Sequence, residues 1–308
     1  MRIGVIGSGA LGLYYGSMLQ RNGGDIHFLL RRDYDAIRAN GLQVYSPNGN
    51  FHLPQLNAYR QAADIGPVDL VIVGLKTGAN DQLVELVTPL VGPRTAILTL
   101  QNGLGNEELL AAAFGAERIL GGVAYLGTNR GEPGVLHHID AGKIDLGEFD
   151  RDISARCRNL AAMFNAAGIP CRAVEDLRRI RWEKLGWNIP FNGLAALHRC
   201  NTAQLMAHSP SKELARQIML EVAAGANAQP LKSRIDAQEF SQKLIAFTEK
   251  MNPYRPSMLV DREQGRPMEL EAIFATPLRQ AKAAGVEMPR IEMLYQLLDF
   301  CAKKAGPN

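Results

Sequence analysis

Three polar side chains recur at four-residue intervals in the apolar stretch RWEKLGWNIPFN, residues 181–192: Lys184, Asn188 and Asn192. On a helix, positions four residues apart lie roughly above one another, so the three would form a narrow polar stripe. A lysine on a helix that is apolar nearly all round is costly unless it is paired or lies at the wall of a cleft. The stripe therefore predicts a site that uses an amine and two amides, or else a surface helix with a solvated lysine.

A glycine-rich turn, GSGALG, follows the apolar run RIGVI at the start of the sequence and opens a helical pattern. In this G-x-G-x-x-G arrangement the first glycine permits a tight turn and the second lets a pyrophosphate approach the backbone. The third allows close packing of the helix on the strand, and amides at the helix N-terminus face the phosphates. The predicted dinucleotide-binding segment is Gly7, Ser8, Gly9, Ala10, Leu11 and Gly12.

Basic residues end the second apolar run, FLLRRDYD, about 20 residues after the glycine turn. At this position an NAD-preferring fold usually carries an acidic residue that binds the ribose hydroxyls. A guanidinium suits the 2′-phosphate of NADP because it offers charge and a planar fork of donors, so Arg31 favours NADP. Two alternatives stay open: Asp33 could reach the ribose, and the arginines could merely solvate the strand end.

Two more turns follow apolar runs, LKTGAN with Lys76 and LQNGLG with Asn102. Ligands of open α/β sheets bind outside the carboxyl ends of the strands, so both side chains are candidates for the same site. The sequence alone does not separate this interpretation from a plain helix start at Lys76 and an Asn-Gly turn at Asn102.

Short apolar runs alternate with helical patterns in the first half of the chain, which is a βαβ rhythm. Continuous rather than alternating apolar runs indicate strands covered on both faces of a parallel sheet. The expected strands are 2–6, 25–30, 69–75, 96–100, VAYLG, GVLHHI and KIDLGE, with helices after Gly9, to about Leu90 and over 152–167.

From about Asp176 onward only helical patterns remain. They cover 177–197, 210–228, 236–250, 266–284 and 290–304. The sequence therefore predicts two domains, residues 1–175 with a parallel α/β sheet and residues 176–308 built from helices.

Composition excludes several classes of protein. The 308 residues are 46% hydrophobic with a formal net charge of +3, which is too small to indicate a nucleic-acid or membrane partner. No run approaches the roughly 18 apolar residues of a membrane span, and the glycine-rich N-terminus lacks a signal-peptide cleavage site. Four scattered cysteines fit reduced thiols in a cytoplasmic protein, and adjacent His137 and His138 on a strand face opposite sides, so no metal is expected.

Several short motifs in collinear order make the chain resemble the ketopantoate reductase family, the 2-dehydropantoate 2-reductases. They are GSGALG, FLLR, LKT, QNGLG, PGVLHH with DLGE, RWEKLGWNIPFN and SMLVDREQGRPMELE, and they extend from residue 1 to about 300. The resemblance implies a Rossmann-type α/β domain followed by an all-helical domain related to the C-terminal domain of 6-phosphogluconate dehydrogenase. It also implies NADPH-dependent reduction of a 2-oxo acid, 2-dehydropantoate to pantoate in pantothenate biosynthesis.

The resemblance assigns roles position by position. Lys184 and Glu269 match the catalytic lysine and glutamate of the family. The substrate pocket corresponds to Asn102, Asn188, Asn192 and Ser257, and the cofactor side to the glycine turn, Arg31, Lys76 and Asn102. The structural alternatives are a buried hydrogen-bonded helix contact for the two helical asparagines and a helix N-cap for Ser257. A homodimer is an open alternative for the assembly.

Reduction of a ketone explains why a lysine is needed. Hydride delivery builds negative charge on the carbonyl oxygen, which requires a hydrogen-bond donor and then a proton. Lys184 can supply both. An apolar wall of Trp182, Leu185 and Trp187 would lower the lysine pKa, whereas Glu269 would favour the ammonium form.

The chain departs from the family pattern just after the glutamate. Phe274 and Ala275 stand where the family commonly has an Asn-Gly pair, and Pro277 follows within a predicted helix. A proline removes one internal hydrogen bond, so we expect a kink beside the substrate pocket.

Two other functions are compatible with the same domain plan. One is an oxidative dehydrogenase of a 3-hydroxy acid or sugar acid, and the other is a non-catalytic regulator that binds NADPH. Retention of both Lys184 and Glu269 argues against the regulator.

Overall fold

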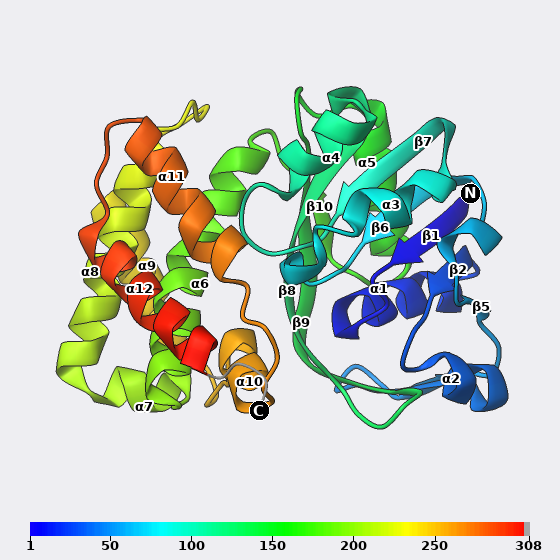
Figure 1. Cartoon of the computed structure of the whole chain (residues 1–308), viewed down its shortest axis with the longest axis horizontal. Coiled ribbons are helices and arrows are strands. Elements are labelled where there is room, and N and C mark those ends of the chain that lie inside the picture. The colour runs from blue at the N-terminus through cyan, green and yellow to red at the C-terminus, as the bar shows by residue number, and fades with distance from the viewer. Residues whose placement is uncertain (305–308) are drawn as a thin grey trace. The chain divides into compact units, whose positions relative to one another are not determined.

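The computed structural model describes residues 1–304, so the last four residues of the predicted 176–308 domain lie outside the described part. The chain divides into two compact units (Figure 1). The first comprises Met1–Asn102 and Asn106–Leu177, and the second comprises Gly103–Gly105 and the chain from Arg178 onward.

A ten-stranded mixed sheet is the centre of the first unit, with the strand order β4-β3-β9-β8-β7-β6-β1-β2-β5 and β10 beside β9. Strands β1 (Arg2–Ile6), β2 (Asp25–Leu29), β6 (Val68–Val73) and β7 (Val91–Thr99) are parallel neighbours. Their apolar runs are almost entirely buried, as expected for strands covered on both faces. The predicted α/β sheet domain followed by a helical domain is confirmed.

Several strands of the sheet differ from the prediction in number and extent. GVLHHI and KIDLGE belong to one strand, β9 (Val135–Glu148), which pairs antiparallel with β8 (Ile119–Arg130). The short strands β3 (Leu42–Tyr45), β4 (Phe51–Leu53), β5 (Asn57–Tyr59) and β10 (Cys171–Ala173) were not predicted, because runs of three or four residues carry little periodic signal.

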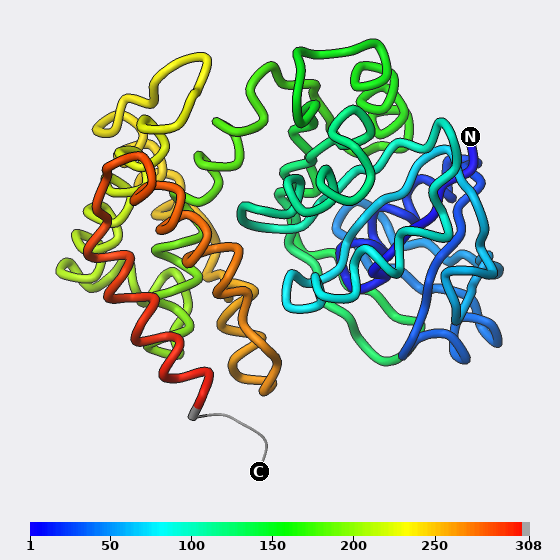
Figure 2. Tube along the Cα trace, turned by 45° about the horizontal axis from the view of Figure 1, so that its top comes forward, coloured from blue at the N-terminus to red at the C-terminus, as the bar shows by residue number. Residues whose placement is uncertain are grey.

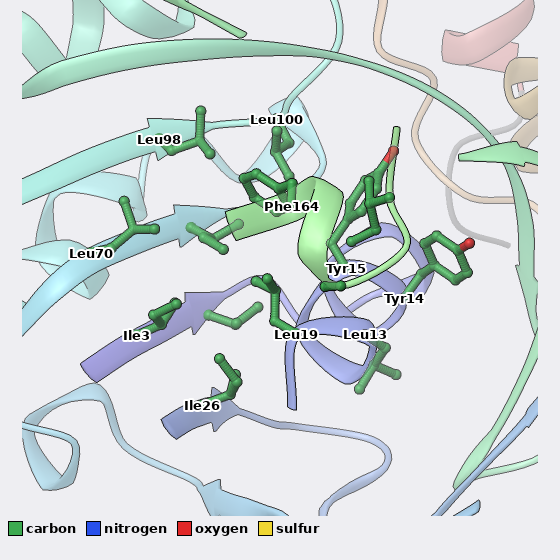
Figure 3. Packing of buried hydrophobic residues seen from close by; sticks show 14 of the residues in the cluster. Ile3, Leu13, Tyr14, Tyr15, Leu19, Ile26, Leu70, Leu98, Leu100 and Phe164 are labelled. Carbon is green, nitrogen blue, oxygen red and sulfur yellow. The ribbon is translucent and has the colours of Figure 1, made fainter. Parts of the chain in front are cut away.

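Helices cover both faces of this sheet. On one face α1 (Ala10–Arg21) and α5 (Ala155–Ala166) bury one apolar cluster, and on the other α3 (Leu83–Val87) and α4 (Asn106–Phe114) bury a second. Figure 3 shows the first cluster, in which aromatic and leucine side chains of α1 and α5 lie beside those of the strands, among them Tyr15, Leu19, Phe164, Ile3, Leu70 and Leu98. The predicted helix to Leu90 is three short segments, η2 (Thr77–Ala79), α3 and η3 (Thr88–Leu90). The remaining segments are α2 (Tyr34–Asn40), η1 (Ala62–Asp64) and η4 (Ala116–Arg118).

Helices are the regular elements of the second unit in its described residues, and the yellow-to-red part of the trace in Figure 2 follows the later ones. Its helices are α6 (Leu177–His198, whose first residue belongs to the first unit), α7 (Thr202–Ala207), α8 (Ser209–Asn227), α9 (Ala237–Lys250), α10 (Ser257–Glu263), α11 (Thr276–Ala283) and α12 (Pro289–Lys304). They enclose one core built around Trp182, Phe191 and Phe274. The buried carboxylate of Glu221 on α8 accepts hydrogen bonds from the backbone amides of Arg290 and Ile291 and so caps α12.

The predicted helix over 266–284 is wrong in its first half. A π-helical turn, η5 (Glu271–Ala275), precedes α11, and Pro277 is the second residue of α11. Proline is tolerated in the first turn of a helix, but here its missing N–H leaves one carbonyl of the preceding π-helical turn without a donor in its own segment. The kink expected from Pro277 stays a prediction; what precedes the proline is the wider π-helical turn, in which Phe274 is fully buried.

The four cysteines and the adjacent pair His137 and His138 all lie within the described residues. All four cysteines are free, and burial raises the pKa of Cys157 to about 11 and that of Cys171 to about 12. His138 is buried while His137 is exposed and stacks on Tyr45, so the two rings do face opposite ways. Within residues 1–304 no group of three potential ligands could hold a metal ion, and no helix has the length and apolarity to cross a membrane.

Candidate functional site

The carboxyl ends of four parallel strands bring the predicted cofactor residues to one edge of the first unit. The glycine turn follows β1, Arg31 follows β2, Lys76 follows β6 and Asn102 follows β7. These strands are adjacent in the order β7-β6-β1-β2, with β6 and β2 on opposite sides of β1. The strand order therefore reverses at β1, and ligands of open α/β sheets bind at such a switch point.

The glycine turn has the geometry that its sequence predicts. Gly7 has a φ of 90°, and a Cβ on it would lie 2.2 Å from the backbone nitrogen of Leu75. A Cβ on Gly12 would lie 2.4 Å from the carbonyl oxygen of Gly7, so only glycine permits this approach of helix to strand. A Cβ on Gly9 would meet nothing within 4 Å. The structural roles of Gly7 and Gly12 are confirmed, whereas Gly9 has open space beside it.

The N-terminus of α1 is suited to an anion. Gly9 is its N-cap, no side chain caps it, and its first turn holds no acidic residue. The first amides of a helix lack intrahelical acceptors and carry partial positive charge, which favours a bound phosphate. Ser8 does not compete for these amides, because its buried hydroxyl donates to the carbonyl of Val5 at 3.4 Å.

The two charged residues that end β2 have different surroundings. Arg31 is exposed, and its guanidinium donates to Gln82 Oε1 at 3.1 Å. Asp33 is only 3% exposed, and its carboxylate accepts hydrogen bonds from the Arg130 guanidinium and, at 3.3 Å, from the backbone N–H of Gly134. A carboxylate buried and bonded in this way is poorly placed to bind ribose, whereas the Arg31 guanidinium is exposed at the end of the strand.

A chain of amide side chains joins the turns after β6 and β7, and sequence reasoning missed it. Thr99 donates to Gln101 at 3.1 Å, Gln101 to Asn80 at 2.8 Å, and Asn80 to Asn106 at 2.9 Å. Asn106 then donates to the backbone carbonyl of Asn102 at 3.0 Å. These hydrogen bonds hold the backbone at Asn102.

Helix α6 carries the polar stripe. One helix spans Leu177–His198, so the predicted alignment of Lys184, Asn188 and Asn192 is confirmed. Asn188 is 5% exposed and Asn192 3%, whereas Lys184 is half-buried. The surface-helix alternative is therefore wrong for most of the stripe. The neighbouring Trp182 and Leu185 are buried in the core, so the apolar wall predicted for Lys184 is partly inside the helical bundle.

Asn192 and Ser257 meet at the start of α10. The side-chain carbonyl of Asn192 accepts hydrogen bonds from the Met258 amide at 3.3 Å and from the Ser257 hydroxyl at 3.5 Å. Pro256, not Ser257, is the N-cap, so the N-cap alternative for Ser257 is wrong. Asn192 makes the buried structural contact that its alternative described, and this contact places the Ser257 hydroxyl.

Glu269 lies just before the π-helical turn and is 5% exposed. Its backbone carbonyl accepts a hydrogen bond from the amide of Ile273 at 3.2 Å. The Arg262 guanidinium, on α10, donates to the carbonyls of Ala196 and Leu197 near the C-terminus of α6. Arg262 thereby joins α10 to the C-terminal end of α6, the helix that carries the polar stripe.

Comparison with known proteins covers nearly the whole chain. The family described as "Ketopantoate reductase PanE/ApbA" matches residues 3–151, and "Ketopantoate reductase PanE/ApbA C terminal" matches residues 176–302. A 2-dehydropantoate 2-reductase from Nostoc sp. is 42% identical over 301 residues, which cover 96% of this chain and 93% of that protein.

Solved structures agree with these matches. The crystal structure of a 2-dehydropantoate 2-reductase from Geobacter metallireducens has a TM-score of 0.96 and 57% identity, covering 97% of this chain and 99% of that one. A D-mandelate dehydrogenase with NADH and anilino(oxo)acetate has a TM-score of 0.91 at 22% identity and full coverage of both chains, which shows a shared fold alone.

Proposed function

Because the chain belongs to the ketopantoate reductase family, we propose that it reduces 2-dehydropantoate to pantoate with NADPH, a step of pantothenate biosynthesis. The observation that carries this proposal is similarity over nearly the full length to two 2-dehydropantoate 2-reductases, one of them 57% identical. Membership makes the chain an oxidoreductase. The substrate, the choice of NADPH and the residue roles below are parts of the proposal.

The cofactor is assigned to the strand ends of the first unit. The pyrophosphate would lie near Gly9 at the N-terminus of α1, where a Cβ would meet no atom within 4 Å and no side chain caps the helix. Arg31 would bind the 2′-phosphate, since the nearby carboxylate of Asp33 is buried and bonded. Lys76 and Asn102 follow the two adjacent strands and complete the same edge.

Catalysis is assigned to the second unit. The strand-end residues of the first unit would hold NADPH, whose contribution would be a hydride for the carbonyl carbon of the substrate. Lys184 donates a hydrogen bond to the carbonyl oxygen as negative charge builds there, and then gives up a proton to the alkoxide. Glu269 accepts a hydrogen bond from a substrate hydroxyl and orients the lysine. Asn188, Asn192 and Ser257 line the pocket with neutral donors and acceptors that add no charge beside the reacting carbon.

The test of the proposal is consumption of reduced nicotinamide with a panel of 2-oxo acids, with NADPH and NADH in parallel. We expect the highest kcat/KM with 2-dehydropantoate and NADPH. Oxidation of neither cofactor with any 2-oxo acid would contradict the proposal and support the non-catalytic regulator. Turnover only in the oxidative direction, with a 3-hydroxy acid or sugar acid, would support the oxidative dehydrogenase.

Arg31→Asp is expected to move cofactor preference from NADPH towards NADH. The substitution removes the guanidinium that pairs with the 2′-phosphate and places a repelling carboxylate there, so KM for NADPH should rise by about tenfold or more, or about 1.4 kcal/mol. KM should be measured for both cofactors. Arg32→Asp is the matched control, because Arg32 donates to the Gly131 carbonyl instead. Unchanged preference in Arg31→Asp would remove Arg31 from the site.

Location and assembly follow the family assignment. We propose a cytoplasmic enzyme whose partners are its small-molecule substrate and cofactor, with no nucleic-acid or membrane partner. A homodimer stays a prediction.

A further inference from the structure

In the π-helical turn after Glu269, the backbone carbonyl of Ala272 has no hydrogen-bond donor at the position that the π-helical pattern requires. The Thr276 amide donates to the carbonyl of Glu271, five residues back. The next donor in this register would be residue 277, which would bond to the carbonyl of Ala272. Residue 277 is proline and has no N–H. Buried carbonyls are almost always paired, so another donor is needed.

That donor comes from the loop QNGLG, far away in the sequence. The Leu104 amide donates to the Ala272 carbonyl at 2.9 Å. Leu104 itself is buried in the core of the second unit, to which Gly103–Gly105 belong. The carbonyl released by Pro277 is therefore bonded by a loop that is anchored by its own apolar side chain.

Gly103 makes this approach sterically possible. It has a φ of 81°, and a Cβ on it would lie 2.3 Å from the Ala272 carbonyl oxygen. Gly105 in the same loop has a φ of 93°, but a Cβ there would have only the Thr276 side chain nearby, at 3.5 Å. Both glycines have a left-handed backbone. A methyl group on Gly103 would collide with the π-helical turn, whereas one on Gly105 would not.

We propose that Gly103 and Leu104 are positioning residues, which fix the π-helical turn beside Glu269 through the Leu104–Ala272 hydrogen bond. Because Pro277 has no N–H, no donor from its own helix competes with Leu104 for the Ala272 carbonyl. The bond joins the loop that follows Asn102 to the turn that follows Glu269. Glu269 itself lies three residues before Ala272. The catalytic importance of this tie depends on the proposed function, while the hydrogen bond itself does not.

The test compares Gly103→Ala with Gly105→Ala in the full-length protein. Both introduce an alanine at positive φ, so both carry the same kind of backbone strain. Only Gly103→Ala should speed hydrogen exchange of the Leu104 amide, followed by NMR, and lower kcat for the 2-oxo acid. A displacement near 1 Å at a reacting group costs up to about 100-fold, so a fall of about 10- to 100-fold is expected. The Kd for NADPH should stay within about twofold of the parent value.

Pro277→Ala provides a second variant that introduces no collision. It restores an N–H that competes with Leu104 for the Ala272 carbonyl, so the Leu104 amide should again exchange faster, and kcat should fall while the Kd for NADPH is unchanged. This split distinguishes positioning from general loss of structure, which would weaken NADPH binding as well.

The outcomes separate the two levels of the proposal. Equal exchange and equal kcat in Gly103→Ala and Gly105→Ala would overturn the positioning role. Fast exchange of Leu104 in the parent protein would overturn the hydrogen bond. If the parent consumes no cofactor with any 2-oxo acid, the proposed function has failed, and the hydrogen-exchange comparison alone then decides whether the loop fixes the turn.

Discussion

Replacement of Lys184 with alanine is expected to lower kcat for reduction of the 2-oxo acid by about 10²–10⁴-fold, the usual contribution of a general acid. The physical reason is that no other residue assigned to the pocket carries an ammonium that can both stabilise the developing alkoxide and protonate it. Because Lys184 is half-buried on a helix held by core side chains on either side, the fold should survive the change. Steady-state kinetics and the Kd for NADPH measure the effect, and the Kd should not change.

Two further variants make this result specific. Lys184→Met keeps the length of the side chain without its charge and should lose as much activity as the alanine variant. Lys212→Ala removes a partly exposed lysine of α8 that pairs with Glu249, and it should behave like the parent. Turnover within about threefold of the parent in Lys184→Ala would exclude the lysine as the proton source.

Gly9→Ala is expected to weaken NADPH binding by about tenfold or more, or about 1.4 kcal/mol, while leaving stability nearly unchanged. Its added methyl group meets no protein atom within 4 Å, and its φ of −76° is ordinary for alanine. Replacement of an N-cap glycine with alanine costs no more than about 1 kcal/mol. The methyl group would instead occupy the space assigned to the pyrophosphate. Cofactor titration and thermal unfolding measure the two effects separately.

Gly7→Ala is the matched variant with the opposite profile. Its methyl group would overlap the Leu75 backbone at a positive φ, so it should lower the free energy of unfolding by at least about 2 kcal/mol even without cofactor. If Gly9→Ala bound NADPH as tightly as the parent, the pyrophosphate could not lie over Gly9. If instead it unfolded as easily as Gly7→Ala, the space beside Gly9 would not be open.

The main strands and long helices could be predicted because their sequence signals are strong and local. RIGVI and DLVIVGL are continuous apolar runs, and the patterns over 177–197 and 236–250 differ from the observed helices by one residue or less at each end. Short pieces such as β10 and α7 have three and six residues, too few for a periodic pattern. The union of two expected strands into β9 depends on pairing with β8, a tertiary contact that no local pattern contains.

The candidate site shows the same division. The glycine turn, Arg31, Lys76 and Asn102 could be grouped because each follows a buried parallel strand, and strand order then brings them together. The amide chain through Asn80 and Asn106 could not be foreseen, since a buried polar side chain has no signature until its partner is known. Asn192 lies on the polar stripe of α6 and also bonds the start of α10. This second role depends on a residue 66 positions away in sequence, so it could not be predicted either.

The second unit is not continuous in sequence, because it includes Gly103–Gly105 as well as the chain from Arg178 onward. A fragment that begins at Arg178 would therefore lack a tripeptide belonging to its own interior. The cavity left by Leu104 and the unbonded carbonyl of Ala272 would both weaken such a fragment, so the helical half cannot be separated from the sheet half by a single cut without loss. Exchange of whole domains between relatives must for the same reason carry this tripeptide along with the C-terminal half.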